Sequence, residues 1–285
     1  MFLSRHWPSP AKLNLFLHIT GRRSDGYHEL QSLFQMLDVG DELHFNITDD
    51  PEILLLSHFP EVPHEQNLIV RAAKLLQTFC GVSKGCTIEV DKILPMGGGI
   101  GGGSSNAATT LVALNHLWRC NLTNQQLQHL GLQLGADVPV FINGKTTFAT
   151  GVGEQFQAAP ETQQTFLVVN PGVHVSTAEV FTDPELPRNS ALLDTAHYRF
   201  EDTRNDCQAL VCKKHPVIAN TLQWLLQYAP SRMTGTGASI FGVFNHPEDA
   251  QKALHDLPEH CSGFVAQGCV ESPLHKRLSQ ELPEF

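Results

Sequence analysis

Apolar and polar residues alternate near the start of the chain. The apolar residues take every second position of segment 12–20, at Leu13, Leu15, Leu17 and Ile19. Successive side chains of a β-strand point to opposite faces, so this spacing predicts a strand with one strongly apolar face. Lys12 and Asn14 then share the other face. A polar turn is expected at 21–27, and segment 41–48 alternates again and predicts a second strand.

Helical spacing dominates the next part of the chain. Asn67 is a suitable N-cap for a helix whose apolar stripe is formed by Ile69, Ala72, Ala73, Leu76 and Phe79. A short strand is expected at 87–92, followed by a cluster of glycines. A second helix is expected from about Ser104, with Ala107, Leu111, Leu114 and Trp118 on one side. Thr123 and Gln126 form a capping box for a third helix.

The C-terminal half mixes the two periodicities. Pro216 begins a helix, segments 240–245 and 263–267 are strand-like, and 250–257 reads as a helix between them. This order predicts a compact α+β unit. Alternation weakens and polar residues cluster between 155 and 171, so we expect two domains, at 1–160 and 161–285.

Composition and charge narrow the class of protein. The 285 residues are 41% hydrophobic, which is enough for a core, but no apolar run approaches the ~20 residues of a membrane span. Lysine and arginine number 19 against 29 acidic residues, a net charge of −10. This charge disfavours binding to nucleic acid or to anionic lipid. We therefore expect a small-molecule ligand, with no membrane and no obligate protein partner.

The cysteines and histidines do not form a metal or disulfide framework. There are seven cysteines, an odd number, with no C-x-x-C, and the 15 histidines show no metal-ligand spacing. The N-terminus lacks the apolar segment of a secretory signal. We expect reduced, mostly buried thiols in a cytoplasmic protein.

The segment 95–105, PMGGGIGGGSS, is the strongest chemical signal in the chain. Six glycines in seven positions are entropically costly and are favoured where something must approach the backbone closely. The segment lies between a predicted strand and the start of a helix, whose free N–H groups and dipole attract phosphate. Ser104 and Ser105 add hydroxyls for a phosphate or a magnesium ion. A flexible linker is the alternative, but linkers rarely lead directly into an amphipathic helix.

Segment 95–105 does not fit two common types of phosphate-binding loop. No lysine follows the last glycine, which excludes a Walker A loop. Gly97, Gly99 and Gly102 match G-x-G-x-x-G, a weak pattern that would need an acidic residue ~20 positions on to hold a ribose. No Asp or Glu occurs between Lys92 and Ala136. That gap disfavours a dinucleotide-dependent oxidoreductase.

Asp137 is the first carboxylate after this gap. Its neighbours are small and apolar, which is unusual for an exposed aspartate. It is either a helix cap or a general base, and a base beside a phosphate site implies that a hydroxyl is phosphorylated. Lys12 is its natural partner, although spacing alone does not separate it from an ordinary solvated lysine.

Three segments resemble the three motifs of the GHMP kinase superfamily: 10–15, 95–105 and 234–239. Within it, Gly26-Tyr27-His28, Asn67-Leu68 and 135–139 are similar to the 4-diphosphocytidyl-2-C-methyl-D-erythritol kinase family. The similarity covers residues 7–274. Segment 183–204 matches only loosely, and no site residue is taken from it.

The resemblance implies a two-domain α+β fold with the active site in the cleft. The N-terminal, nucleotide-binding domain would be ribosomal-S5-like and the C-terminal domain ferredoxin-like. It also implies transfer of the γ-phosphate of ATP, with Mg²⁺, to the 2-hydroxyl of the methylerythritol moiety, in the non-mevalonate route to isoprenoid precursors.

The resemblance also assigns residues to roles. Asp137 is the base, and Lys12 orients both it and the hydroxyl. The triphosphate is wrapped by Pro95, Met96, Gly97, Gly98, Gly99, Ile100, Gly101, Gly102, Gly103, Ser104 and Ser105, with Asn67 and Lys92 near the nucleotide. Tyr27, His28 and Phe181 would hold the cytosine, with Asn14 and Thr177 near the substrate. No side chain is assigned as a metal ligand.

Other functions remain open at this point. Another GHMP kinase, such as homoserine kinase, has no need of an aromatic and histidine pair for cytosine. The oxidoreductase is disfavoured by the missing ribose carboxylate. A catalytically inactive nucleotide-binding module would require loss of Lys12 or Asp137, and both are present.

Overall fold

The computed structural model describes residues 4–60, 62–160 and 164–281. The strands in these ranges are β1 (Ser4–Arg22), β2 (His28–Thr48), β3 (Ile53–Leu55), β4 (Gly85–Asp91), β5 (Thr147–Thr150), β6 (Gln155–Ala158), β7 (Thr165–Asn170), β8 (Ser231–Met233), β9 (Ile240–Phe244) and β10 (Ser262–Cys269).

The helices are α1 (Leu68–Cys80), α2 (Gly102–Leu117), α3 (Asn124–Leu132), α4 (Val138–Asn143), α5 (Thr177–Thr182), α6 (Gln208–Lys214), α7 (Pro216–Leu225), α8 (Pro247–His255) and α9 (Pro273–Glu281). Three short 3₁₀ helices accompany them: η1 (His64–Gln66), η2 (Thr195–His197) and η3 (Phe200–Asp202). The mixed α+β fold expected from the sequence is confirmed. No helix in the described residues is long and apolar enough to cross a membrane.

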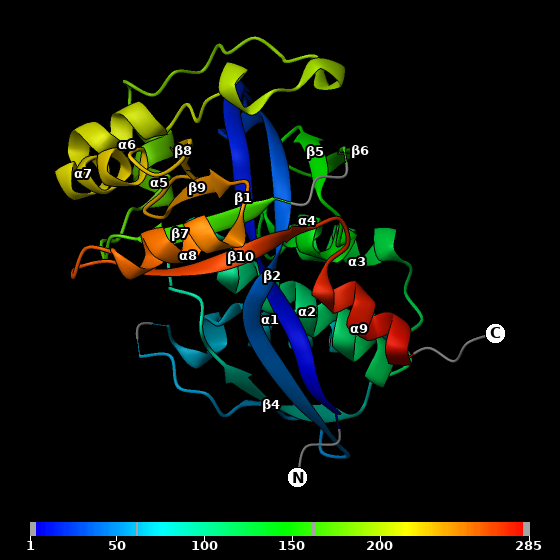
Figure 1. Ribbon diagram of the computed structural model, residues 1–285. Helices are drawn as coiled ribbons and strands as arrows, with labels where there is room; N and C mark the ends of the chain where they lie inside the picture. Colours follow the sequence, from blue (N-terminus) through cyan, green and yellow to red (C-terminus); the bar gives the residue numbers. More distant parts are fainter. Residues whose placement is uncertain (1–3, 61, 161–163, 282–285) are drawn as a thin grey trace.

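A long antiparallel hairpin, β1–β2, runs through the whole molecule (Figure 1). The sheet order is β3-β4-β2-β10-β7-β9-β8, with β1 and β5 also paired to β2. Strand β10 pairs with β2 through Gly268 and Cys269 and with β7 along 262–267, so one strand connects the two halves of the sheet.

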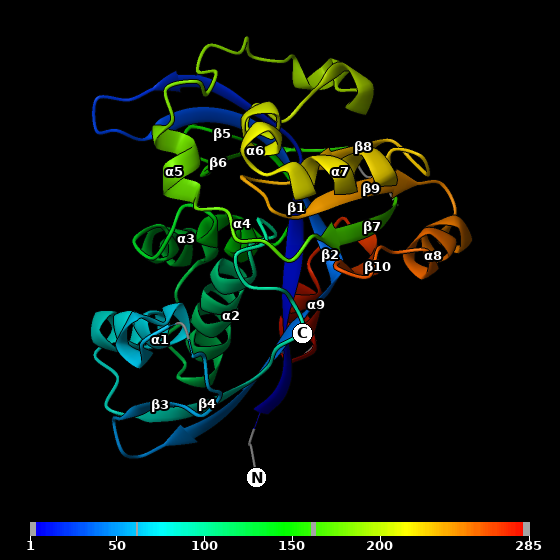
Figure 2. The same ribbon diagram turned by 90° about the vertical axis from the view of Figure 1, so that its left-hand side faces the viewer.

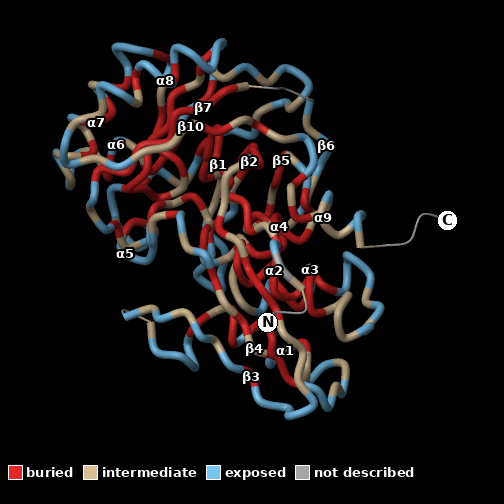
Figure 3. Tube along the Cα trace, turned by 60° about the horizontal axis from the view of Figure 1, so that its bottom comes forward, coloured by how far each residue is buried: buried red, intermediate tan, exposed pale blue. Residues whose placement is uncertain are grey.

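Helices cover the sheet in two groups. In Figure 2, α1 and α2 lie beside β3 and β4 in the lower part, and α6 and α7 lie beside β8 and β9 in the upper part. One hydrophobic cluster joins the lower helices to β2 and β4, and includes Phe45, Leu76 and Leu111. A second cluster lies between the upper helices and the sheet. A third cluster, which contains Phe16 of β1 and Phe166 of β7, lies between the first two. In Figure 3, buried chain follows the strands and inner helices, while exposed chain is concentrated in the loops.

Strand β7 was not expected from the sequence. All six of its residues are buried, because it lies between β10 and β9 with both faces covered. A strand of that kind is a continuous apolar run rather than an alternation. It lies inside segment 155–171, where polar and apolar residues do not alternate regularly.

The predicted inward position of Phe79 is wrong. Its side chain is 56% exposed, and Cys80 packs against the core in its place. With 3.6 residues per turn, the stripe that contains Ile69, Ala73 and Leu76 continues to position 80, just before Gly81 ends the helix in a left-handed conformation.

His18 is buried on β1, and neither ring nitrogen has a hydrogen-bond partner among the described residues. Burial lowers its pKa, as do Arg204 and Arg232, against an opposing effect of Asp206. The folded protein therefore holds this ring neutral, while the unfolded chain takes up a proton near pH 6.5.

We expect the free energy of unfolding to fall as the pH drops from about 6.5 through the lowered pKa of folded His18. The loss is about 1.4 kcal/mol for each unit by which folding lowers the pKa. Urea unfolding at pH 7.5 and pH 5.5 measures it. His18→Phe should lose less stability than the wild type over this interval; equal losses would show that His18 does not contribute.

Candidate active site

Two adjoining cavities lie beside the glycine segment, with volumes of about 450 and 590 Å³. The first is lined by most of segment 95–104, by Asn67 and by Lys92. The second is lined by Lys12, Asn14 and the turn that carries Tyr27. Residues that line both are Gly99, Ser104, Asp137 and Thr177. The two cavities therefore meet at Asp137.

Glycine is required at Gly99 and Gly101 for a reason the sequence did not reveal. Both have positive φ, 73° and 77°. A Cβ at Gly99 would lie 2.6 Å from the carbonyl oxygen of Thr234, and one at Gly101 would lie 2.6 Å from the buried ring of Phe141. The close approach at these two positions is made by the protein itself, so the glycines position the loop against the 234–237 turn and against α4.

The N-terminus of α2 opens into the first cavity. Its N-cap, Gly101, provides no side-chain cap, and Gly102, Gly103 and Ser104 line the wall. Free N–H groups and the helix dipole make such an end favourable for anions. Among the described residues that line this cavity, Asp137 is the one carboxylate and Lys92 the one lysine.

Two residues of the predicted loop line neither cavity. Ile100 is fully buried, and its carbonyl oxygen accepts a hydrogen bond from the Lys12 backbone N–H at 3.1 Å. Ser105 is also buried, and its hydroxyl has no hydrogen-bond partner among the described residues. Ile100 thus anchors the loop to β1, and Ser104 is the serine on the cavity wall.

Lys12 and Asp137 form an ion pair, with Nζ 3.1 Å from Oδ2. The lysine side chain is only 2% exposed, while that of Asp137 is 40% exposed. Lys12 Nζ also donates to Oδ1 of Asn14 at 2.6 Å and to the carbonyl oxygen of Gly99 at 3.4 Å. Asn14 in turn donates to Oγ of Ser32, which fixes its amide. The ammonium group is thus held beneath a carboxylate that faces the cavities.

Asp137 occupies the N-cap position of α4, but its side chain makes no capping hydrogen bond. The capping alternative raised by the sequence is therefore wrong. The carboxylate is paired with Lys12 instead, and it remains accessible to a ligand in either cavity.

Lys92 and Asn67 lie on the wall of the first cavity. Lys92 Nζ is 2.8 Å from Oδ2 of the buried Asp41 and also donates to the Leu94 carbonyl oxygen. Asn67 caps α1 by accepting a hydrogen bond from the Ile69 backbone N–H. Asp41 is a positioning partner that the sequence analysis did not identify.

The aromatic residues expected at the substrate line the second cavity. Tyr27 is 61% exposed, and its backbone N–H donates to Oδ1 of Asp25. His28 and Phe181 stack on each other, with ring centroids 5.1 Å apart and an interplanar angle of 26°. Thr177, at the start of α5, has its hydroxyl 2.9 Å from that of Thr236.

Several residues that support the site were missed. Thr234 accepts a hydrogen bond from the Asn14 backbone N–H at 2.9 Å, and Arg188 donates to the His28 ring. Thr234 could have been found, because it is the first residue of the 234–239 motif. Nothing in segment 183–204 distinguished Arg188.

Gly101→Ala should destabilise the protein by about 2–5 kcal/mol. Left-handed backbone costs about 1–2 kcal/mol for alanine, and overpacking against Phe141 adds about 1–3 kcal/mol. Gly81→Ala is a matched control, since φ is +64° but nothing lies within 4 Å of its Cβ. Urea unfolding of both variants measures the difference. Equal losses would show that Phe141 yields without cost.

Known proteins similar to this chain align with nearly all of it. Residues 67–145 match the family described as GHMP kinases N terminal domain, and residues 190–263 match GHMP kinases C terminal. A 4-diphosphocytidyl-2-C-methyl-D-erythritol kinase of Pseudoalteromonas atlantica is 60% identical over 273 residues, 96% of each chain. One from Shewanella woodyi is 56% identical over 279 residues, 98% of each chain.

Solved structures show the same fold. A crystal structure of 4-(cytidine 5'-diphospho)-2C-methyl-D-erythritol kinase has a TM-score of 0.76 and 29% identity, covering 92% of this chain and 98% of that one. A homoserine kinase from Cytophaga hutchinsonii has a TM-score of 0.65 at 16% identity, covering 92% of this chain and 93% of that one. The second likeness concerns the fold alone.

Proposed function

Because the chain belongs to the GHMP kinases and, within them, to the 4-diphosphocytidyl-2-C-methyl-D-erythritol kinase family, we propose that its two cavities bind the two substrates of that reaction. ATP occupies the first cavity and the cytidine substrate the second. The γ-phosphoryl group passes to the 2-hydroxyl of the methylerythritol moiety. The observation that carries this assignment is the Lys12–Asp137 pair at the junction of the cavities.

The first cavity suits a triphosphate. Its wall combines the uncapped N-terminus of α2 with Lys92, and the one carboxylate among its described lining residues is at the end that meets the second cavity. The phosphates of ATP would lie along Gly97–Ser104, and the nucleoside toward Asn67. This orientation directs the γ-phosphate toward Asp137.

Asp137 is the general base of the phosphoryl transfer. Its carboxylate accepts the proton of the 2-hydroxyl while that oxygen bonds to the γ-phosphorus and the bond to the β–γ bridging oxygen breaks, releasing ADP. Lys12 holds the carboxylate in place and its charge stabilises the negative charge on the transferred group. Thr177 and Asn14 border the position of the hydroxyl.

We also propose that Mg²⁺ accompanies ATP. The Ser104 hydroxyl lies on the wall shared by both cavities, and hydroxyl and phosphate oxygens with water are ligands that Mg²⁺ accepts. Within the described residues, the one group with metal-ligand spacing is Glu42, His44 and Asp91, and none of them lines either cavity. The ion would therefore be held mainly by the nucleotide, and it would neutralise charge on the phosphates.

The experiment that tests the function is a coupled ADP-release assay. The purified chain receives ATP with the cytidine substrate, with homoserine or with mevalonate, each with and without Mg²⁺. We expect turnover with the cytidine substrate alone and only when Mg²⁺ is present. Turnover of homoserine in place of the cytidine substrate would contradict the proposal.

Tyr27→Ala should raise the Michaelis constant for the cytidine substrate by about 5- to 150-fold and leave that for ATP nearly unchanged. Base–aromatic stacking contributes about 1–3 kcal/mol, and the exposed Tyr27 ring is available for it. Turnover at saturation should survive, because the contact is similar in ground and transition states. Phe79→Ala, another exposed aromatic but outside both cavities, is the control. An unchanged constant would exclude stacking on Tyr27.

We place the N-terminal domain at 1–160 and the C-terminal domain at 161–285, which agrees with the positions of the two family matches. Leu274 of α9 packs into the cluster formed by α1 and α2, so the last helix would return to the first domain. We further propose that the protein acts in the cytoplasm on small molecules, without an obligate protein partner.

A further inference from the structure

Arg188 connects the two walls of the second cavity. Its Nε donates to Nε2 of His28 at 2.9 Å, and Nη2 donates to the carbonyl oxygens of Phe181 at 3.0 Å and of Asp183 at 2.6 Å. Nη1 donates to the Leu186 carbonyl oxygen at 3.0 Å. The guanidinium group thus contacts the His28 ring directly and the end of α5, which carries Phe181.

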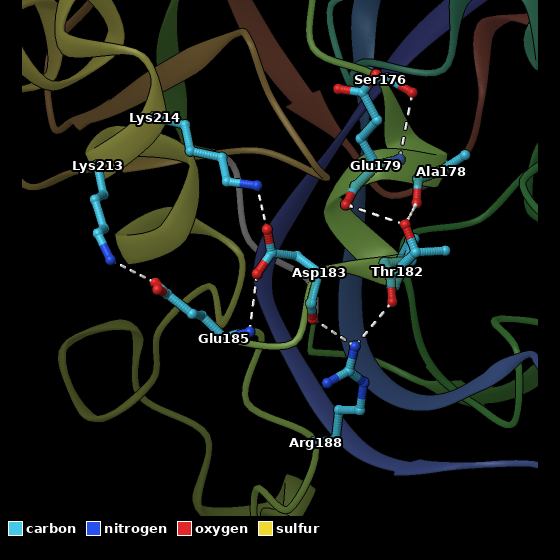
Figure 4. Close-up of polar contacts among 10 residues, drawn as sticks. Ser176, Ala178, Glu179, Thr182, Asp183, Glu185, Arg188, Lys213 and Lys214 are labelled. Atoms are coloured by element: carbon cyan, nitrogen blue, oxygen red, sulfur yellow. Dashed lines mark hydrogen bonds and ion pairs between the residues drawn. The ribbon is translucent and has the colours of Figure 1, made fainter.

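The loop that follows α5 is itself held in place. The carboxylate of Asp183 pairs with Lys214 of α6 and accepts the backbone N–H of Glu185. Glu185 pairs with Lys213. In Figure 4 the guanidinium of Arg188 points at Asp183, on the side away from the two lysines. Arg188 therefore approaches His28 from an anchored loop.

The contact fixes the tautomer of His28. A guanidinium group has donors and no acceptor, and it does not deprotonate in proteins. Since Arg188 Nε can only donate, His28 Nε2 must carry the lone pair, and the proton of the neutral ring is on Nδ1. His28 lines the second cavity, and Nδ1 has no hydrogen-bond partner among the described residues. The ring thus has a spare N–H donor.

A fixed donor distinguishes the two pyrimidine bases. Ring nitrogen N3 of cytosine is an acceptor, whereas N3 of uracil carries a proton. An Nδ1–H group pairs with the first and faces another donor in the second, which leaves polar groups unsatisfied. The opposite tautomer would reverse the preference.

We propose that Arg188 is a positioning residue that keeps His28 in the Nδ1–H tautomer and thereby makes the second cavity select cytosine over uracil. The inference rests on the proposed function only in placing the base beside His28. Arg188 lies outside the motifs that identify the family.

The charges around His28 determine how the selection depends on pH. Burial lowers the pKa of His28, and so do Arg188 and Arg22, the residue opposite it on β1. Other charged groups on the cavity wall are Lys12, Asp25 and Asp137. Removing Arg188 raises the pKa of His28. A protonated ring carries N–H on both nitrogens, so it again presents a donor at Nδ1.

The test is calorimetric binding of CDP and UDP to wild type and Arg188→Met at pH 8 and pH 5.5. Wild type should prefer CDP by about 5- to 150-fold at both pH values. Arg188→Met should lose most of this preference at pH 8 and regain it at pH 5.5. Arg199→Met is the matched control, because the Arg199 side chain is exposed and its ion pairs within the described residues are with Glu201 and Asp202; it should behave as wild type.

Three outcomes would overturn the proposal. In the first, Arg188→Met keeps the wild-type preference at pH 8, which would mean that Arg188 does not set the tautomer. In the second, the variant loses the preference at both pH values, which would mean that Arg188 only shapes the pocket. A wild-type protein that turns over the cytidine substrate but binds CDP and UDP equally would refute the tautomer mechanism while leaving the proposed function intact. If Arg188→Met does not fold, the ¹⁵N shifts of the His28 ring in wild type decide: a protonated Nε2 and bare Nδ1 refute the proposal.

Discussion

Asp137→Asn should keep the fold and ATP binding and lose about 10²- to 10⁴-fold in turnover. Asparagine preserves the shape of the side chain at the junction of the cavities but cannot accept the hydroxyl proton. It also leaves Lys12 without its carboxylate partner, although Asn14 and the Gly99 carbonyl oxygen still contact the ammonium. Steady-state kinetics with the cytidine substrate, together with calorimetry for ATP, measures the two effects separately.

The control for this substitution is Asp249→Asn. Asp249 is an exposed carboxylate on α8 that pairs with Lys252, and it lines neither cavity. Turnover of Asp137→Asn within a factor of ~3 of wild type would show that it is not the base. Catalysis would then come from positioning and charge, which a loose phosphoryl-transfer transition state permits.

Lys12→Met should lower turnover by about 10²- to 10³-fold, the usual effect of removing one preorganised electrostatic group. Methionine fills a similar volume but leaves Asn14 Oδ1 and the Asp137 carboxylate without their cation. Lys12→Arg should not restore activity, because the side chain is only 2% exposed and its ammonium is enclosed by Asn14, Gly99 and Asp137, which leaves little room for a larger, planar head group.

A double-mutant cycle tests whether Lys12 and Asp137 act together in catalysis. If Lys12 and Asp137 act as one unit, the double variant should be hardly slower than Asp137→Asn alone. Multiplied losses would mean that the two residues act independently and would contradict the assigned role of Lys12. Thermal unfolding of each variant shows whether loss of the buried cation also destabilises the fold.

The sequence predicted best where a single local rule applied. The Asn67 cap, the Thr123–Gln126 capping box and the helix after Pro216 are all present. These features depend on neighbours within one turn of helix. Strand β7 depends instead on being covered on both faces, and Phe79 on which side of the last helical turn meets the core. Both are decided by distant parts of the chain.

The residues of the site were also predicted only in part. The chemistry of Lys12 and Asp137 was predicted from a charge gap and a resemblance, and the ion pair between them is present. The supporting contacts were not predicted, because Ser32, Asp41 and Arg188 each contact a site residue that lies 18, 51 or 160 positions away in the sequence. No periodicity or motif marks such a residue. The glycines have a second role that the sequence did not indicate, since two of them also let the chain pack closely on itself.

The β1–β2 hairpin has a consequence for the protein's synthesis. Strand β1 makes hydrogen bonds to residues that are synthesised much later. The Leu17 backbone N–H donates to the Arg204 carbonyl oxygen, the Asn14 backbone N–H donates to Thr234, and Arg232 donates to the Leu15 carbonyl oxygen. At roughly 5–20 residues per second, a ribosome would take about 10–45 s to reach Thr234 after Lys12. During that time the apolar face of the first strand must be kept from other partners. A nascent chain that stops short of this turn would carry both Lys12 and Asp137, yet it would lack the Thr234 hydroxyl that accepts the backbone N–H of Asn14 beside the lysine.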